Sequence, residues 1–98
     1  MPRGAEREAA APDRQRLDKF LVYARFVKTR SVALDLVSAG RVRINSEKPG
    51  RPDRAVFIGD VLTLALPHAT LVIEIAAFAD RRGSPAEAQK LYAIVQPD

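Results

Sequence analysis

The chain has 98 residues, enough for one small domain with a modest core, and 47% of them are hydrophobic, too many for a disordered polycation. It contains no cysteine, which excludes disulfides and thiolate metal sites and fits a reducing cytosol. No apolar run approaches the roughly 20 residues that a membrane span requires, so we expect a cytoplasmic protein with no membrane partner.

The positive charge is concentrated in one part of the chain. From Arg14 to Arg54 there are eleven of the sixteen basic residues against four acidic ones, a net charge of +7, whereas residues 1–13 carry −1 and residues 55–98 carry −2. A local positive field of this kind attracts phosphates, so nucleic-acid binding is one candidate function.

The first thirteen residues are charged and rich in alanine, and they lack the apolar core of a secretion signal. We therefore expect a flexible leader over residues 1–13, a single domain with a C-terminal helix over residues 14–94, and a short tail over residues 95–98.

Two short helices are predicted at the start of this domain. Apolar residues recur at the helical spacing from Leu17 to Ala24. Thr29 is a suitable N-cap for a second helix, and Gly40 is suited to a left-handed C-terminal cap after it. Because few residues separate the two helices, we expect them to pack on each other as a hairpin.

After Gly40 the pattern becomes typical of strands. Residues 41–44 alternate charged and apolar side chains, which predicts a strand with one buried and one basic face. Asn45-Ser46 is a candidate turn, and the Pro- and Gly-containing segment 48–53 is an expected loop. Further strands are predicted over residues 55–58, 61–66 and 70–78.

The last predicted element is a helix. Ser84 and Glu87 have the spacing of a capping box, and Pro85 suits the first helical position. Leu91 and Tyr92 are expected on this helix. The predicted fold class is α+β: a helical hairpin packed on a small, mostly antiparallel sheet, with a C-terminal helix.

The sequence offers no residues arranged for catalysis. The only histidine, His68, lies in a predicted turn, and one histidine without cysteines or clustered carboxylates makes no metal-ligand set. The carboxylates are scattered, mostly beside basic residues, and no Gly-rich phosphate-binding motif precedes a helix. We therefore expect no enzyme activity, no cofactor and no bound metal.

The basic residues are more informative because of where they fall. Lys28 and Arg30 flank the N-cap Thr29, where free amides and the helix dipole favour a phosphate. Exposed cations at that end destabilise a helix by about 0.3–1 kcal/mol each, so a purely structural sequence tends to place Asp or Glu there. Arg41 and Arg43 share one face of the next strand. We expect the two groups to form one continuous patch.

The aromatic residues are few. Phe20, Phe57 and Phe78 are expected in the core, whereas Tyr23 is left open between core packing and stacking on RNA bases. Asp18 is expected to be structural, either as a cap or as the partner of a neighbouring arginine.

Several segments together resemble the RNA-binding domain named after small-subunit ribosomal protein S-four, the alpha-L motif. They are Arg16-Leu17-Asp18-Lys19-Phe20-Leu21, Lys28-Thr29-Arg30-Ser31, Ala33, Leu36-Val37, Gly40-Arg41-Val42, Ile44-Asn45 and Gly59-Asp60-Val61-Leu62. A narrower resemblance over residues 14–94 is to the ribosome-associated heat-shock protein fifteen family. It rests on the run from Ala24 to Arg30 and on Arg81-Arg82, Glu87-Ala88 and Leu91-Tyr92. A related small protein of bacterial ribosome-associated quality control shares much of the pattern.

The resemblance implies binding of structured RNA through the helical hairpin and the strand after it. The narrower resemblance implies membership of a group of factors that bind the free large ribosomal subunit still carrying peptidyl-tRNA. They contact large-subunit ribosomal RNA and tRNA without catalysis. Recycling and quality control both remain open as the role, and a monomer is expected. Carried over by position, the RNA-facing residues are Arg16, Lys19, Lys28, Thr29, Arg30, Arg41 and Arg43.

Two departures from the family pattern stand out. Asn45-Ser46 replaces the usual Asn-Gly, so the hairpin is expected to be wider there or strained at Ser46. The sequence ends at Gln96-Pro97-Asp98 without the long basic tail of heat-shock protein fifteen, and we expect fewer phosphate contacts as a result.

Two other functions remain open. One is a protein–protein adaptor that docks through the edge of strand Leu71-Val72-Ile73 and the terminal helix. The other is a fragment of an RNA-modifying enzyme or tRNA synthetase, since such enzymes carry domains of this kind.

Overall fold

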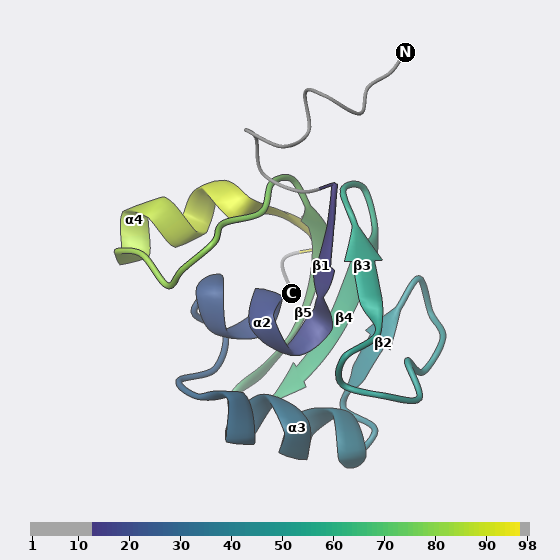
Figure 1. The fold of residues 1–98 in the computed structure, drawn as a ribbon. Coiled ribbons are helices and arrows are strands. Elements are labelled where there is room, and N and C mark those ends of the chain that lie inside the picture. The colour runs from purple at the N-terminus through teal and green to yellow at the C-terminus, as the bar shows by residue number, and fades with distance from the viewer. Residues whose placement is uncertain (1–12, 97–98) are drawn as a thin grey trace.

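The structure, a computed structural model, describes residues 13–96. Residues 1–12 of the expected leader and residues 97–98 of the expected tail lie outside these. Two helices, α2 (Leu17–Tyr23) and α3 (Arg30–Ser38), form a hairpin against an antiparallel sheet, as Figure 1 shows. The predicted α+β class and the helical hairpin are confirmed.

Helix α3 begins and ends as its sequence predicts. The Thr29 hydroxyl accepts a hydrogen bond from the Val32 N–H at 3.3 Å, which confirms the N-cap. After the helix, Gly40 adopts a left-handed φ of 75°, and its N–H donates to the Val37 carbonyl while the Arg41 N–H donates to the Leu36 carbonyl. These two bonds are those of a Schellman motif, in which glycine carries no steric penalty.

Helix α2 ends with the same motif but without glycine. Arg25 takes the left-handed position with a φ of 66°, which costs a non-glycine residue about 1–2 kcal/mol. Its side chain offsets part of this cost, because the Arg25 Nε donates to the Gly83 carbonyl at 2.7 Å. In return, the Arg82 Nε donates to the Val22 carbonyl at 3.3 Å. This reciprocal clasp ties the end of α2 to residues 82–83.

The sheet is antiparallel throughout the described residues. Its strand order is β2-β4-β5-β6, with β2 at Val42–Ile44, β4 at Val61–Leu66, β5 at Ala69–Ile75 and β6 at Tyr92–Gln96. A separate two-stranded sheet pairs β1 (Arg14–Arg16) with β3 (Ala55–Phe57). The sequence predicted neither β1 nor β6, because short strands are stabilised by a partner rather than by their own pattern.

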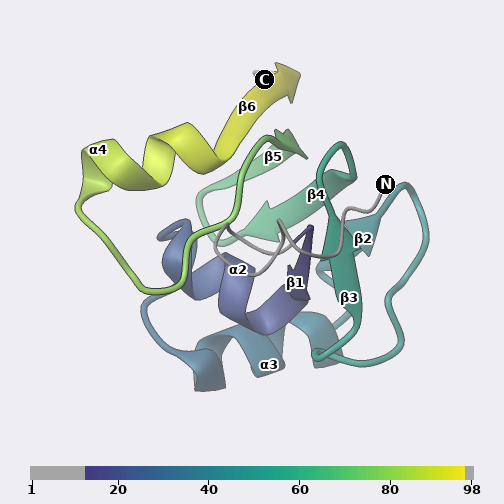
Figure 2. The ribbon, with the colours of Figure 1, turned by 45° about the horizontal axis from the view of Figure 1, so that its top comes forward.

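The C-terminal helix is shorter than predicted. Its capping box is present: the Ser84 hydroxyl accepts from the Glu87 N–H, and the Glu87 carboxylate accepts from the Ser84 N–H. Helix α4 spans Pro85–Ala88 and continues as the 3-10 turn η1, Gln89–Leu91. Tyr92 lies in β6, not on the helix, because its strand pairs with β5, as Figure 2 shows. Val95 and Gln96 of the expected tail belong to the same strand.

The core lies between the helices and the sheet. Phe20 and Phe78 are buried as predicted, with ring centroids 6.1 Å apart in an edge-to-face arrangement. The prediction for Phe57 is wrong: its side chain is 44% exposed. In β3 the neighbouring Val56 points inward, so the strand alternation turns Phe57 outward, opposite Arg14. The largest fully buried apolar side chains are Leu17, Phe20, Leu21, Val42, Ile44, Val56, Leu62, Leu64, Ile73 and Ile75.

The hairpin turn after β2 is tight. Ile44 and Glu47 exchange two backbone hydrogen bonds of 2.8 and 2.9 Å, which leaves Asn45 and Ser46 as a two-residue loop. Their φ values of 51° and 76° are both left-handed, as a type I′ turn requires. The expectation of a wider hairpin is therefore wrong, and the alternative of strain at Ser46 is confirmed.

The position of β5 removes the docking edge proposed for an adaptor. This strand lies between β4 and β6 and pairs with both of them. The backbone of Leu71 to Ile73 is therefore engaged within the sheet, and Ile73 is fully buried. At Val72 and Ile73 both sides of β5 are paired, so a partner strand has no free edge to add to there.

Candidate nucleic-acid interface

Five of the seven predicted site residues lie where the helical hairpin begins its two helices. Lys19 is on α2, Arg16 directly precedes α2, and residues 28–30 lead into α3. Lys19 borders two shallow hollows, one shared with Arg16 and the other with Arg30. We call this group the hairpin cluster: Arg16, Lys19, Lys28, Thr29 and Arg30.

A buried carboxylate organises the hairpin cluster. Asp18, fully buried, accepts two hydrogen bonds from Arg16, at 3.1 Å from Nε and 2.8 Å from Nη2. The same carboxylate accepts from the Arg30 Nε at 3.1 Å and from the Lys19 backbone N–H at 2.8 Å. It therefore joins the start of α2 to the start of α3, and the structural role expected for Asp18 is confirmed.

Asp18 stays ionised at neutral pH. Burial by itself raises the pKa of this carboxyl, but the hydrogen bonds and charge of Arg16, the Lys19 N–H and Arg30 outweigh burial, so that the pKa is lowered overall. The hydrogen bond to Asp18 likewise raises the pKa of Arg16, against the opposing effect of its own desolvation. One carboxylate thus holds two guanidinium groups, and the three side chains together keep a charge of +1.

Arg16 and Arg30 are fixed by Asp18 but remain partly exposed to solvent. Their side chains are 38% exposed for Arg16 and 58% exposed for Arg30. A guanidinium has five N–H donors, so each arginine retains donors for a second acceptor after binding Asp18. Fixed, partly exposed guanidinium groups are well suited to phosphate oxygens.

The lysines of the cluster carry the uncompensated charge. Lys19 and Lys28 are exposed, and neither forms an ion pair with another residue in the range 13–96. Lys28 precedes the capped N-terminus of α3, where the helix dipole also favours an anion. The Thr29 hydroxyl is already engaged as the cap acceptor.

The remaining two predicted residues lie at the other end of α3. Val42 and Ile44 of β2 face the core, so Arg43 points away from it, and Arg41 is also exposed. We call Arg41 and Arg43 the strand pair. Figure 1 shows the start of α3 and strand β2 at opposite ends of that helix. The nine residues of α3 correspond to about 13 Å along the helix axis, which separates the strand pair from the part of the hairpin cluster at the start of α3.

Among residues 13–96, no side-chain hydrogen bond or ion pair connects the strand pair to the hairpin cluster. Arg43 contacts its own turn instead, through a weak bond of 3.4 Å from Nη1 to the Ser46 carbonyl. The seven predicted residues are therefore arranged as two groups at opposite ends of one helix.

Two features of this region were not predicted from the sequence. Arg14 borders the same hollow as Arg16 and Lys19, because β1 places it next to α2. The sequence also did not predict that Asp18 bridges two arginines, because Asp18 and Arg30 are twelve positions apart in the sequence and only the packed hairpin brings them into contact.

Other site types have little support in the part of the chain that the structure describes. His68 is exposed in the turn between β4 and β5, as predicted. Over residues 13–96, no three His, Cys, Asp or Glu side chains are grouped to hold a metal. Over the same residues, no helix has the length and apolar character to cross a membrane.

Comparison with known proteins supports the fold. The sequence model of the S4 domain family matches residues 15–62, a range that contains all seven predicted site residues. The structure described as trimeric Vibrio cholerae Heat Shock Protein 15 has a TM-score of 0.79 with this chain. It is 40% identical, over 84% of this chain and 82% of that one.

Two relatives differ in length. The Haemophilus influenzae heat shock protein 15 homolog is 39% identical over 79% of this chain, but the match covers only 58% of that protein. The Bacillus subtilis RQC P-site tRNA stabilizing factor is 29% identical over 85% of this chain, and the match covers 94% of it. The chain thus matches little more than half the length of the curated heat shock protein 15 relative from Haemophilus influenzae. The monomeric state expected for it stays a prediction.

Proposed function

Because the chain belongs to the heat shock protein 15 family of S4-domain proteins, we propose that it is a non-enzymatic, RNA-binding accessory factor of the ribosome. It works in the cytoplasm and binds large-subunit ribosomal RNA and tRNA. Its target is the free large subunit that still carries peptidyl-tRNA. The name of the Bacillus subtilis relative, a P-site tRNA stabilizing factor, supports this target.

The observation that carries the proposal is the hairpin cluster. It presents two lysines that have no ion-pair partner among residues 13–96, and two positioned arginines, at the start of two packed helices. Cations held on rigid elements suit the phosphates of folded RNA, and they position a protein on RNA without reading its bases. The strand pair adds two further cations, which contact a second stretch of the same RNA backbone.

The first test is whether the protein travels with ribosomes. Sedimentation of a cell lysate at low salt is expected to place the protein with large subunits, and high salt is expected to release it. Crosslinking in the low-salt fraction identifies the RNA. Absence of the protein from the large-subunit fraction at low salt contradicts the proposal.

The second test assigns the binding to the hairpin cluster. Each phosphate contact contributes about −0.7 to −0.9 to the slope of log affinity against log salt. The double variant Lys19→Gln, Lys28→Gln is expected to make that slope shallower by about 1.4–1.8. Neither lysine has an ion-pair partner among residues 13–96, so the fold is expected to stay intact.

A matched control lowers the net charge by the same two units elsewhere. Lys48→Gln with Gln89→Glu changes exposed residues outside both basic groups. This control is expected to keep the wild-type slope. An equal change of slope in both double variants would show that binding follows total charge rather than the hairpin cluster.

A further inference from the structure

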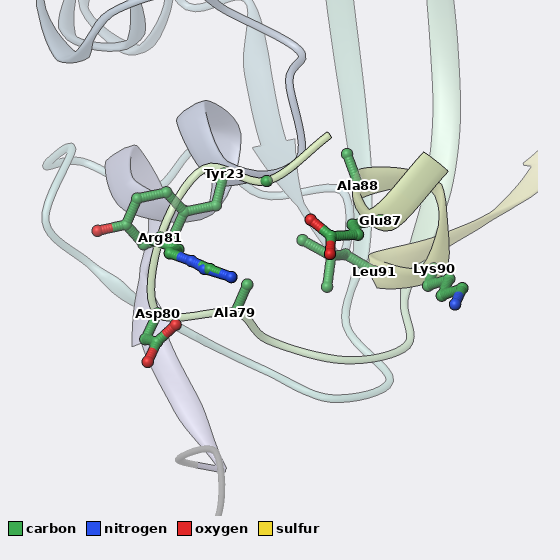
Figure 3. A pocket seen from close by; sticks show the side chains of 9 residues that line it. Tyr23, Ala79, Asp80, Arg81, Glu87, Ala88, Lys90 and Leu91 are labelled. Atoms are coloured by element: carbon green, nitrogen blue, oxygen red, sulfur yellow. The ribbon is translucent and has the colours of Figure 1, made fainter. Parts of the chain in front are cut away.

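Tyr23 borders a further hollow, in addition to the one that it shares with Lys19 and Arg30. The further hollow lies between α2 and residues 79–91, as Figure 3 shows, and has a volume of about 260 Å³. Its apolar lining comes from Ala79, Ala88 and Leu91, and charged side chains surround that lining. We call it the tyrosine pocket; its lining residues are Tyr23, Ala79, Asp80, Arg81, Gly83, Glu87, Ala88, Lys90 and Leu91.

The walls of the tyrosine pocket are held in place. The clasp between Arg25 and Gly83 and between Arg82 and Val22 fixes residues 82–83 against α2. The capping box fixes the Glu87 side chain on the facing wall. A pocket whose walls are already ordered loses little conformational entropy when it binds a ligand.

The tyrosine pocket adjoins the proposed RNA-binding surface. Tyr23 lines both this pocket and the hollow that Lys19, Asp18 and Arg30 share. An RNA strand whose phosphates lie on the hairpin cluster therefore passes directly beside Tyr23.

The size and chemistry of the tyrosine pocket fit one heterocyclic ring. Its volume is below the roughly 300–1,000 Å³ of sites for drug-sized ligands, which is too small for a helix. The aromatic ring of Tyr23 offers a stacking surface, and exposed Asp80 and Glu87 offer acceptors for amino groups. Arg81, which extends over the hollow in Figure 3, forms no ion pair in the described range and can bind the adjoining phosphate.

We propose that the tyrosine pocket binds a single unstacked, amino-bearing base from a single-stranded part of the RNA that the hairpin cluster holds. This inference rests on the proposed RNA-binding function. It adds to phosphate contacts a site that distinguishes single-stranded from fully paired RNA.

The test compares two RNAs, a blunt hairpin and the same hairpin with a 3′ overhang of adenosines. Tyr23→Leu is expected to lower affinity for the overhang RNA by about 5- to 150-fold, the range found for loss of one base–aromatic stack. Affinity for the blunt RNA is expected to stay unchanged. Tyr92→Phe is the matched control and is expected to alter neither affinity, because Tyr92 packs on Phe26 and lines no part of the pocket.

A second measurement does not depend on replacing Tyr23. The chain has two tyrosines and no tryptophan, so Tyr23 is the only tyrosine left in Tyr92→Phe. Its fluorescence is expected to be quenched by the overhang RNA and not by the blunt RNA. Arg81→Ala, at an exposed position, is expected to weaken overhang binding alone.

The outcomes separate the two proposals. If the wild-type protein binds neither RNA, the proposed function is wrong. If it binds both equally well and Tyr23 fluorescence does not distinguish them, RNA binding holds and the base site is wrong. Equal loss of affinity for both RNAs in Tyr23→Leu also overturns the base site.

Discussion

The two basic groups of this protein differ in how their side chains are held. In the hairpin cluster, a buried carboxylate holds two arginines and helix termini place two lysines beside them. In the strand pair, Arg41 and Arg43 are exposed near the edge of the sheet, and among residues 13–96 their side chains form one weak hydrogen bond, from Arg43 Nη1 to the Ser46 carbonyl. A basic side chain that is already held in place is better prepared for binding than a free one, because ordering a long side chain costs entropy at the moment of association.

The largest expected difference is in RNA affinity. Lys19→Glu with Lys28→Glu is expected to weaken binding at least about 100-fold, since two charge-assisted contacts of about 1.5 kcal/mol or more each become repulsive. The corresponding change in the strand pair, Arg41→Glu with Arg43→Glu, is expected to cost about tenfold, as mobile exposed charges contribute at most about 1 kcal/mol each. Fluorescence-anisotropy titration with a structured RNA measures both; a larger loss for the strand pair reverses the comparison.

Arg30, although it belongs to the hairpin cluster, is unsuitable for a charge reversal to Glu in that experiment. The reversal would place a second carboxylate against the buried Asp18, so that a loss of binding would follow from misfolding as readily as from a lost contact.

The support of the hairpin cluster is tested by Asp18→Asn. The variant keeps the side-chain shape but leaves two guanidinium groups without their anion, and it is expected to lower the free energy of unfolding by about 1.5–3 kcal/mol. Asp35→Asn, at an exposed position on α3, is the control and is expected to change stability by less than about 0.5 kcal/mol. Urea denaturation measures the free energy of unfolding of both variants. Equal losses in the two would show that Asp18 contributes no more to stability than an exposed carboxylate.

The same carboxylate predicts a pH dependence. Because the folded-state pKa of Asp18 is lowered, its stabilising contribution is fully present above the unfolded pKa of about 3.9. The contribution is lost as the pH falls through the lower, folded-state pKa. Wild-type stability is therefore expected to drop more steeply than that of Asp18→Asn below about pH 4. Thermal melts from pH 7 to pH 2.5 would reveal parallel curves if Asp18 did not contribute.

The smallest expected effect lies at the turn that follows the strand pair. Ser46→Gly removes a left-handed non-glycine residue and is expected to raise stability by about 0.5–1 kcal/mol, after the entropy that glycine loses on folding. Arg25→Gly is the comparison, since it relieves the same strain but forfeits the bond to Gly83, and it is expected to gain less. Differential scanning calorimetry ranks the two; a greater gain for Arg25→Gly would mean that the clasp contributes nothing.

Most of the fold could be predicted from local patterns. The spacing of Leu17 to Ala24, the Thr29 cap and the Gly40 terminus define the hairpin, because each acts through residues within one turn of itself. The elements that were missed, β1 and β6, are three and five residues long and are formed by pairing with distant strands. Tyr92 was assigned to the C-terminal helix because Ala88 and Leu91 before it follow the helical spacing. Its pairing with β5 could not be predicted from that local pattern.

The amino-acid sequence alone determined where the charge is concentrated, which residues begin and end α3, and that a helical hairpin precedes an antiparallel sheet. Only the tertiary structure decided that Asp18 holds Arg16 and Arg30 together, that α3 separates the strand pair from them, and that Tyr23 borders a pocket with α4. The physical reason is the distance along the sequence over which each kind of interaction acts. Caps and periodicity act over a few residues of backbone, whereas a buried ion pair or a pocket depends on which distant segments the core brings into contact.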